Sequence, residues 1–187
     1  MARLAEATRA YEADRYGEAL TILRDVARRA PEVATVRELH GLTLYRLGRY
    51  EQAERELRAS ADLSGSVDQY PVIMDCVRAE GRLDEVEELF TELRRAGASS
   101  DVLTEGRLVM AGALADAGRI DAGIALLEPP ARKPIRSPHD RHIRQWYALA
   151  DLYERSGDLP RARELFARVV AADPGLSDAA ERLAGTR

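Results

Sequence analysis

Apolar residues recur at helical spacing along this chain, most clearly between residues 146 and 174. One apolar stripe ends before Gly157 and a second begins after it, and glycine commonly terminates a helix. The first stripe consists of Trp146, Leu149, Ala150 and Tyr153, and the second of Ala162, Leu165, Phe166, Val169 and Val170. This stretch therefore predicts a helix, a tight turn and a second helix.

The same pattern, a turn residue followed by a new apolar stripe, occurs four more times upstream. These turns lie at residues 14–19, 48–53, 81–86 and 118–123. Counted from Asp14, the steps between successive turns are 34, 33, 37 and 39 residues. A period near 34 with helix-turn-helix content is typical of an α-solenoid, in which helix pairs stack on their neighbours.

At these positions the chain resembles the tetratricopeptide repeat family. The family pattern has an aromatic and a small residue in the first helix, a turn glycine, and a small residue, an aromatic residue and a proline in and after the second. Residues 143–176 match at Trp146, Ala150, Tyr153, Gly157, Ala162, Phe166 and Pro174; residues 34–66 match at Gly41, Leu44, Gly48, Tyr50 and Ala53; and residues 1–33 match at Ala7, Tyr16, Ala19, Leu23 and Pro31. The middle pairs depart from it, because Val86 and Gly123 replace the small alanine.

The resemblance implies an all-α fold, a right-handed α-solenoid or superhelix of five tetratricopeptide-like helix pairs that spans residues 1–187 as a single domain. The pairs are expected at about 1–33, 34–66, 67–98, 99–137 and 138–176, followed by a C-terminal capping helix at 176–185. Such a terminal helix closes the apolar end of a solenoid. Asp178, Glu181 and Arg182 are expected to face solvent.

The fourth pair contains the one interruption of the repeat. Pro129, Pro130 and Pro134 lack the backbone N–H that a helix interior needs, so its second helix is expected to run only from Ile120 to Leu127. A capping box at 137–140, with Ser137 as N-cap, is then expected to start the fifth pair.

Composition argues against several classes of function. The net charge of −4 and the pI near 5.5 do not suit a general nucleic-acid surface, which needs a basic face. The single cysteine, Cys76, excludes an intrachain disulfide and is compatible with a reducing compartment. The sequence shows neither a signal peptide nor an apolar run of membrane-spanning length, so we expect a cytoplasmic protein.

Candidate catalytic and metal-binding residues are few, and we expect no enzyme and no cofactor. His40 shares a register with apolar residues of the other first helices and is expected to face the core. His139 and His142 have no further Cys or His nearby to complete a zinc site and are expected to be cap residues. Cys76 lies inside an apolar stripe, which predicts a small core residue.

The resemblance also implies a function, a non-catalytic scaffold that binds a protein or peptide in the concave groove lined by the first helix of each pair. By that analogy, groove-facing residues include Tyr11, Glu38, Leu42, Tyr45, Asp75, Arg78, Leu108, Tyr147, Asp151 and Glu154. Aromatic and arginine side chains are common anchors of binding surfaces, although Tyr11 and Tyr45 could equally pack between helices. Arg132, Lys133 and Arg136 concentrate positive charge in one segment, which is either a second contact loop or a linker.

Two other functions stay open. Residues 81–97 also resemble the pentatricopeptide repeat family, which would imply binding of single-stranded RNA. A regulatory sensor of a small peptide or metabolite is the third possibility. Family members that grip the acidic tails of chaperones do so with a clamp of Lys, Asn and Arg; this chain has no Asn and only one Lys, so we expect no such clamp.

Overall fold

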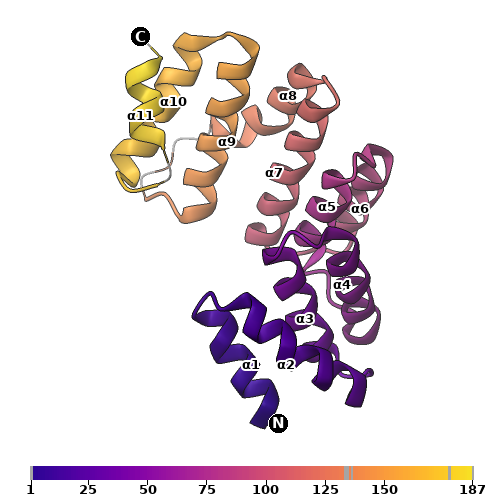
Figure 1. Cartoon of the computed structure of the whole chain (residues 1–187). Coiled ribbons are helices and arrows are strands. Elements are labelled where there is room, and N and C mark those ends of the chain that lie inside the picture. The colour runs from indigo at the N-terminus through magenta and orange to yellow at the C-terminus, as the bar shows by residue number, and fades with distance from the viewer. Residues whose placement is uncertain (1, 133–134, 136, 177, 187) are drawn as a thin grey trace. The chain divides into compact units, whose positions relative to one another are not determined.

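A computed structural model describes residues 2–132, 135, 137–176 and 178–186, and in these residues all regular structure is helical (Figure 1). The described helices are α1 (Ala2–Glu12), α2 (Tyr16–Arg29), α3 (Ala34–Arg46), α4 (Tyr50–Ser64), α5 (Tyr70–Ala79), α6 (Leu83–Arg95), α7 (Ser100–Asp116), α8 (Ile120–Ala131), α9 (Asp140–Ser156), α10 (Leu159–Ala172) and α11 (Ala179–Gly185). The prediction of an all-α fold is confirmed.

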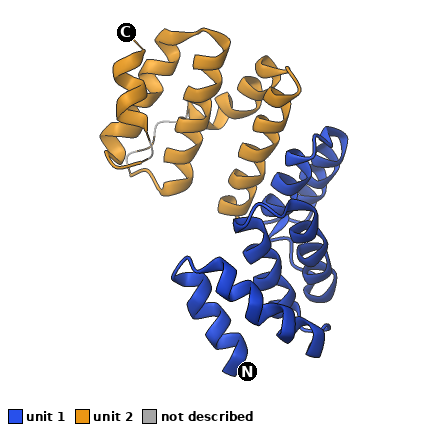
Figure 2. Ribbon diagram, in the orientation of Figure 1, with its two compact units in different colours: residues 1–98 blue, residues 99–187 orange. Residues whose placement is uncertain are grey.

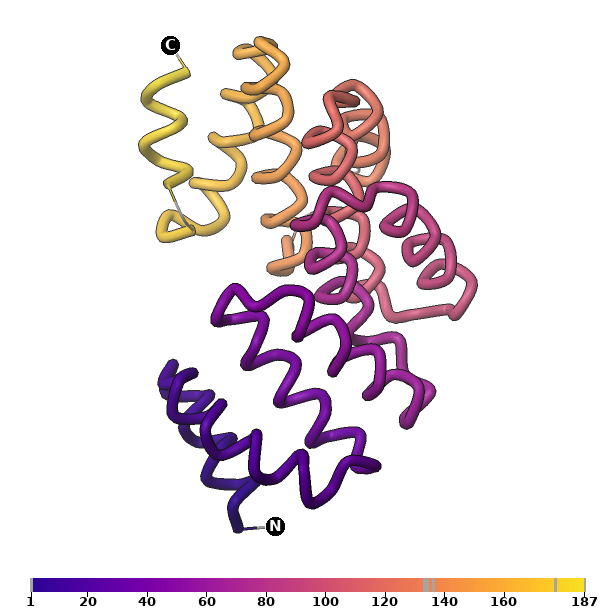
Figure 3. The backbone as a smooth tube through the Cα atoms, turned by 45° about the vertical axis from the view of Figure 1, so that its right-hand side comes forward, coloured from indigo at the N-terminus to yellow at the C-terminus, as the bar shows by residue number. Residues whose placement is uncertain are grey.

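The chain forms two compact units, unit 1 (Met1–Ala98) and unit 2 (Ser99–Arg187), which Figure 2 colours separately. In unit 1, α1 packs on α2, α3 on α4 and α5 on α6, and each pair also contacts the next through α2 with α3 and α4 with α5. In unit 2, α7 packs on α8, α9 on α10, α8 on α9 and α10 on α11. The backbone trace in Figure 3 follows these antiparallel hairpins along each unit.

The turns inside the helix pairs depend on left-handed backbone conformations. Gly157, for example, caps α9 with φ 86°, a value that only glycine adopts without strain. The first pair uses Asp14 instead, with φ 56°, and its carboxylate accepts a hydrogen bond from the Tyr16 hydroxyl. Aspartate tolerates this conformation better than most residues because its short polar side chain bonds locally. The sequence-predicted turns are therefore the points where the paired helices reverse.

Small residues let the helices of a pair approach closely. Gly41 of α3 faces Leu57 of α4, and a Cβ atom on Gly41 would lie 2.6 Å from Leu57 Cγ.

Cys76 is buried in unit 1, where burial first, and then nearby carboxylates, raise the pKa of its thiol to about 12. It is thus a protonated core side chain at neutral pH.

Helix α8 extends beyond the predicted end at Leu127, so that prediction was wrong. The helix includes Pro129 and Pro130 and ends at Ala131. Its last turn is held by tertiary contacts: Gln145 Nε2 donates to the Leu127 carbonyl at 2.9 Å, and Leu127 and Ala131 are buried in the core of unit 2. These contacts offset the backbone hydrogen bonds that the prolines cannot make. Pro134 lies outside the described residues.

The start of α9 also differs from the expectation. Its N-cap is His139 rather than Ser137, and the capping box joins His139 to His142. The His139 N–H donates to His142 Nδ1 at 3.0 Å. Burial, together with Arg141 and His139, lowers the pKa of His142, which favours the neutral imidazole that accepts this bond. The two histidines are helix-cap residues, as their positions predicted.

The contacts of Glu56 predict a pH-dependent contribution to the stability of unit 1. It accepts a hydrogen bond from Arg37 Nη1 at 2.7 Å and lies 3.4 Å from His40 Nδ1. Burial alone would raise the pKa of the Glu56 carboxyl, but His40 and Arg37 outweigh it and lower the pKa below its ordinary value. A lowered folded-state pKa stabilises the fold above the unfolded pKa, and this contribution disappears as pH falls through the folded pKa.

We therefore expect Glu56→Gln to destabilise unit 1 at pH 7 and to cost progressively less below about pH 4.3, the ordinary glutamate value. Urea unfolding followed by far-UV circular dichroism between pH 3 and pH 7 measures this. Exposed Glu51→Gln, on the same helix, is the control. A difference between Glu56→Gln and the native chain that stays constant across this pH range would contradict the prediction.

Candidate binding surfaces

The first helices of neighbouring pairs lie side by side within each unit: α1 with α3 and α3 with α5 in unit 1, and α7 with α9 in unit 2. They carry the ten sequence-predicted groove residues. We call Tyr11, Glu38, Leu42, Tyr45, Asp75 and Arg78 the first-helix face of unit 1, and Leu108, Tyr147, Asp151 and Glu154 the first-helix face of unit 2. All ten side chains are half-buried, so each touches its own unit and still reaches solvent.

A hydrogen-bonded group joins α3 to α5 on the first-helix face of unit 1. The Tyr45 hydroxyl donates to Asp75 Oδ2 at 2.7 Å, and Arg78 Nη1 donates to Asp75 Oδ1 at 3.3 Å. Burial first, and then the bond to Asp75, raise the pKa of Tyr45, so the hydroxyl keeps the proton that it donates. Three of the predicted residues are thus one connected group, fixed in position across two repeats.

Glu38 and Tyr11, two other members of this face, contact neighbours that the sequence did not indicate. Gln69 Nε2 donates to Glu38 Oε1 at 2.7 Å, which links α3 to the residue that caps α5. The Tyr11 ring makes an edge contact with Tyr16 at 5.3 Å between centroids. The Tyr45 ring is tilted against that of Tyr50, with centroids 5.9 Å apart. Tyr11 and Tyr45 therefore pack within their own helix pairs and also remain partly exposed.

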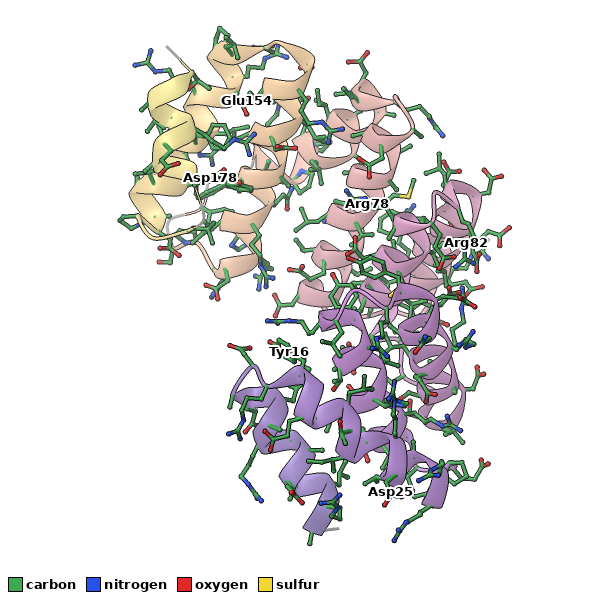
Figure 4. The ribbon with its side chains drawn as sticks, in the orientation of Figure 1. Tyr16, Asp25, Arg78, Arg82, Glu154 and Asp178 are labelled. Atoms are coloured by element: carbon green, nitrogen blue, oxygen red, sulfur yellow. The ribbon has the colours of Figure 1, made fainter. Side chains whose placement is uncertain are left out.

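On unit 2, the C-terminal helix engages the first-helix face. Arg182 of α11 donates to Asp151 Oδ1 at 2.8 Å and to Glu154 Oε2 at 3.0 Å. The Tyr147 hydroxyl donates to Asp178 Oδ1 at 2.6 Å. Leu108 packs against the core of the unit and takes no part in this network. Figure 4 labels Glu154 and Asp178 among the side chains of unit 2.

The expectation that Arg182 faces solvent was therefore wrong. Its side chain is only 18% exposed, because it turns toward α9. Asp178 and Glu181 are exposed as expected, although Asp178 is bonded to Tyr147. Helix α11 follows the fifth pair and so occupies the position of a further first helix, next to the first helix α9. The position of Arg182 in the repeat, rather than its charge, could therefore have indicated that it contacts α9.

The predicted basic segment is only partly described. Arg132 is exposed and forms an ion pair with Glu128, with Nη2 2.8 Å from Oε1. Lys133 and Arg136 lie outside the described residues. The segment stays a predicted second contact loop, with a linker as the alternative.

Models of the family "Tetratricopeptide repeat" match residues 4–67 and 143–186, which together make up more than half of the chain. The chain belongs to the tetratricopeptide repeat family. Neither match includes residues 81–97, the segment that resembles pentatricopeptide repeats. Among curated proteins, none matches this sequence.

Solved structures agree with this assignment. A thermophilic TPR protein of Thermus thermophilus, TTC0263, is 20% identical, with a TM-score of 0.75 over 98% of this chain and 96% of that one. A tetratricopeptide repeat protein of Parabacteroides merdae is 17% identical, with a TM-score of 0.73 over 98% and 69%. YrrB, described as a TPR protein with an unusual peptide-binding site, is 14% identical, with a TM-score of 0.57 over 96% and 89%. At these identities the similarity shows the fold, and the predicted α-solenoid is confirmed.

The tetratricopeptide fold indicates a scaffold for protein interaction, and the family is generally non-catalytic. In the described part of the chain, no three His, Cys, Asp or Glu side chains gather where they could hold a metal ion. Nor does any described helix combine the length and apolar character that crossing a membrane requires.

Proposed function

We propose that this protein binds a protein or peptide partner and that the first-helix face of unit 1 is its principal contact surface. The observation that carries the proposal is the Tyr45–Asp75–Arg78 group. Its members are held in place by hydrogen bonds between α3 and α5, yet the side chains of Asp75 and Arg78 remain 28% and 32% exposed. A surface whose side chains are already ordered loses less conformational entropy when a ligand binds.

The chemistry of this group suits a peptide. Tyrosine and arginine are the residues that most often anchor protein interfaces, and Tyr45 and Arg78 lie on either side of the same carboxylate. Glu38 and Asp75 add acceptors for backbone N–H groups or for basic side chains of a ligand. The peptide-binding site reported for YrrB supports the proposal by analogy of fold. The mixed charge of the face argues against RNA as the ligand, because phosphate contacts need a basic surface.

The test begins with selection of peptide ligands on the whole 187-residue chain from a displayed random library. For the strongest ligand, we expect Tyr45→Ala and Arg78→Ala each to weaken binding by about tenfold or more, the loss typical of an interface anchor. Fluorescence anisotropy with the labelled peptide measures this.

The matched control is Arg55→Ala on α4, which removes an exposed arginine that forms an ion pair with Glu51 of its own helix. It should leave affinity unchanged. Circular dichroism melting of each variant separates loss of binding from loss of folding. Equal affinity for the native chain and for both first-helix variants would refute this surface as the binding site.

A further inference from the structure

Helix α11 is fixed to unit 2 by little apolar area. It has seven residues, of which only Ala179 is buried, while Leu176 before it and Leu183 are partly buried against the core. A helix of this length is not stable by itself in water. Segments with few buried apolar contacts open at low free-energy cost. The polar contacts of Arg182 are therefore a large part of what holds α11 in place.

The surface that receives Arg182 belongs to α9 and α10. Asp151 and Glu154 accept hydrogen bonds from its guanidinium, and the Tyr147 hydroxyl accepts one more at 3.1 Å. The guanidinium also lies over the Phe166 ring, 4.6 Å from its centroid, and 5.4 Å from that of Tyr147. We call Tyr147, Asp151, Glu154 and Phe166 the arginine-binding cluster.

The geometry of the cluster suits a planar guanidinium better than an ammonium group. Two carboxylates accept from the edge of the planar group while aromatic rings cover its face, an arrangement that a lysine ammonium does not reproduce. Burial alone would lower the pKa of Arg182, but its bonds to Glu154, Asp151 and Tyr147 outweigh burial and raise it, so the charge is permanent. Arg155 also approaches Asp151, at 3.7 Å, but does not enter the cluster.

We propose that the arginine-binding cluster is a second partner site, which binds an arginine on a helical segment of a partner protein, and that α11 is its internal occupant, displaced when that partner binds. The partner segment would repeat the spacing in α11: an acceptor at the position of Asp178, a small residue at that of Ala179, and Arg-Leu at those of Arg182 and Leu183. This proposal extends the proposed function to unit 2, and its test involves no residue of unit 1.

The test uses the whole 187-residue chain carrying Arg182→Ala and, as a probe, a labelled peptide with the sequence of residues 175–186. In the native chain, the tethered α11 competes with the peptide at high effective concentration, so we expect the Arg182→Ala chain to bind the peptide at least about tenfold more tightly. Replacing the peptide's arginine by lysine should weaken this binding, and replacing it by alanine should abolish it. Adding Asp151→Asn and Glu154→Gln to the Arg182→Ala chain should abolish it as well.

A second measurement needs no variant. Hydrogen exchange of the native chain should show the amides of α11 exchanging through local opening, faster than those of α9 and α10, and excess peptide should accelerate them further. Peptide binding that does not depend on its arginine, or equal binding by the native and Arg182→Ala chains, would show that α11 is only a terminal cap. Exchange of α11 solely through global unfolding would overturn the proposal even if Arg182→Ala failed to fold. The peptide and the variants concern unit 2 alone. Neither outcome therefore bears on the proposed function of unit 1, which is tested by the experiment described for it above.

Discussion

Phe166→Ala is expected to lower the free energy of unfolding of unit 2 by about 3–5 kcal/mol, the usual cost of removing a buried aromatic side chain. Phe166 is fully buried, and its ring makes an edge contact with Tyr147, 5.8 Å between centroids. The same ring lies beneath the Arg182 guanidinium. The alanine variant would therefore leave a cavity between α9 and α10 and also remove one wall of the contact that holds α11.

Trp146 makes the measurement specific to unit 2, because it is the only tryptophan in the chain and lies on α9. Urea unfolding followed by its fluorescence gives the change in free energy. The matched control is Leu159→Ala at the start of α10, where the side chain is 40% exposed and the expected loss is small. A loss for Phe166→Ala no larger than that for Leu159→Ala would contradict the packing described here.

Features that depend on nearby residues were predictable from the sequence. The helix pairs follow from apolar residues at helical spacing, and the turns follow from residues such as Gly157 and Asp14 that adopt positive φ. The register of the repeats also placed all ten predicted surface residues on first helices, where they are half-buried.

Features that depend on distant contacts were not predictable in the same way. The last turn of α8 continues past two prolines, where Gln145, on another helix, bonds to the Leu127 carbonyl. Likewise, Arg182 turns inward because it bonds to two carboxylates on α9, which lie 28 and 31 residues earlier in the chain. Local rules give prolines and charged residues their usual roles, a helix end and a solvated face. Only the packed unit shows where tertiary contacts override those roles.

Gly123→Ala offers the sharpest test of helix spacing, because its expected effect has the opposite sign to the usual one. Alanine normally stabilises a helix relative to glycine by about 0.5–1 kcal/mol. At Gly123 of α8, however, a Cβ atom would lie 2.9 Å from the Ala111 carbonyl oxygen of α7 and 3.2 Å from Leu152 Cδ1 of α9. A backbone oxygen cannot rotate away, so α7 and α8 must separate, and we expect a loss of about 1–3 kcal/mol, as for other overpacked cores.

Gly17→Ala is the matched control, since Gly17 also lies in the first turn of a second helix but has no atom within 4 Å of its added Cβ. It should gain stability up to the ordinary alanine increment of about 0.5–1 kcal/mol. Urea unfolding by circular dichroism compares both variants, and Trp146 fluorescence follows Gly123→Ala within unit 2. If Gly123→Ala stabilised the chain as Gly17→Ala does, α7 and α8 would have room for the alanine that the family pattern carries at this position. A loss confined to Gly123→Ala would instead show that this pair is packed more tightly than the family pattern requires, with glycine as the residue that permits it.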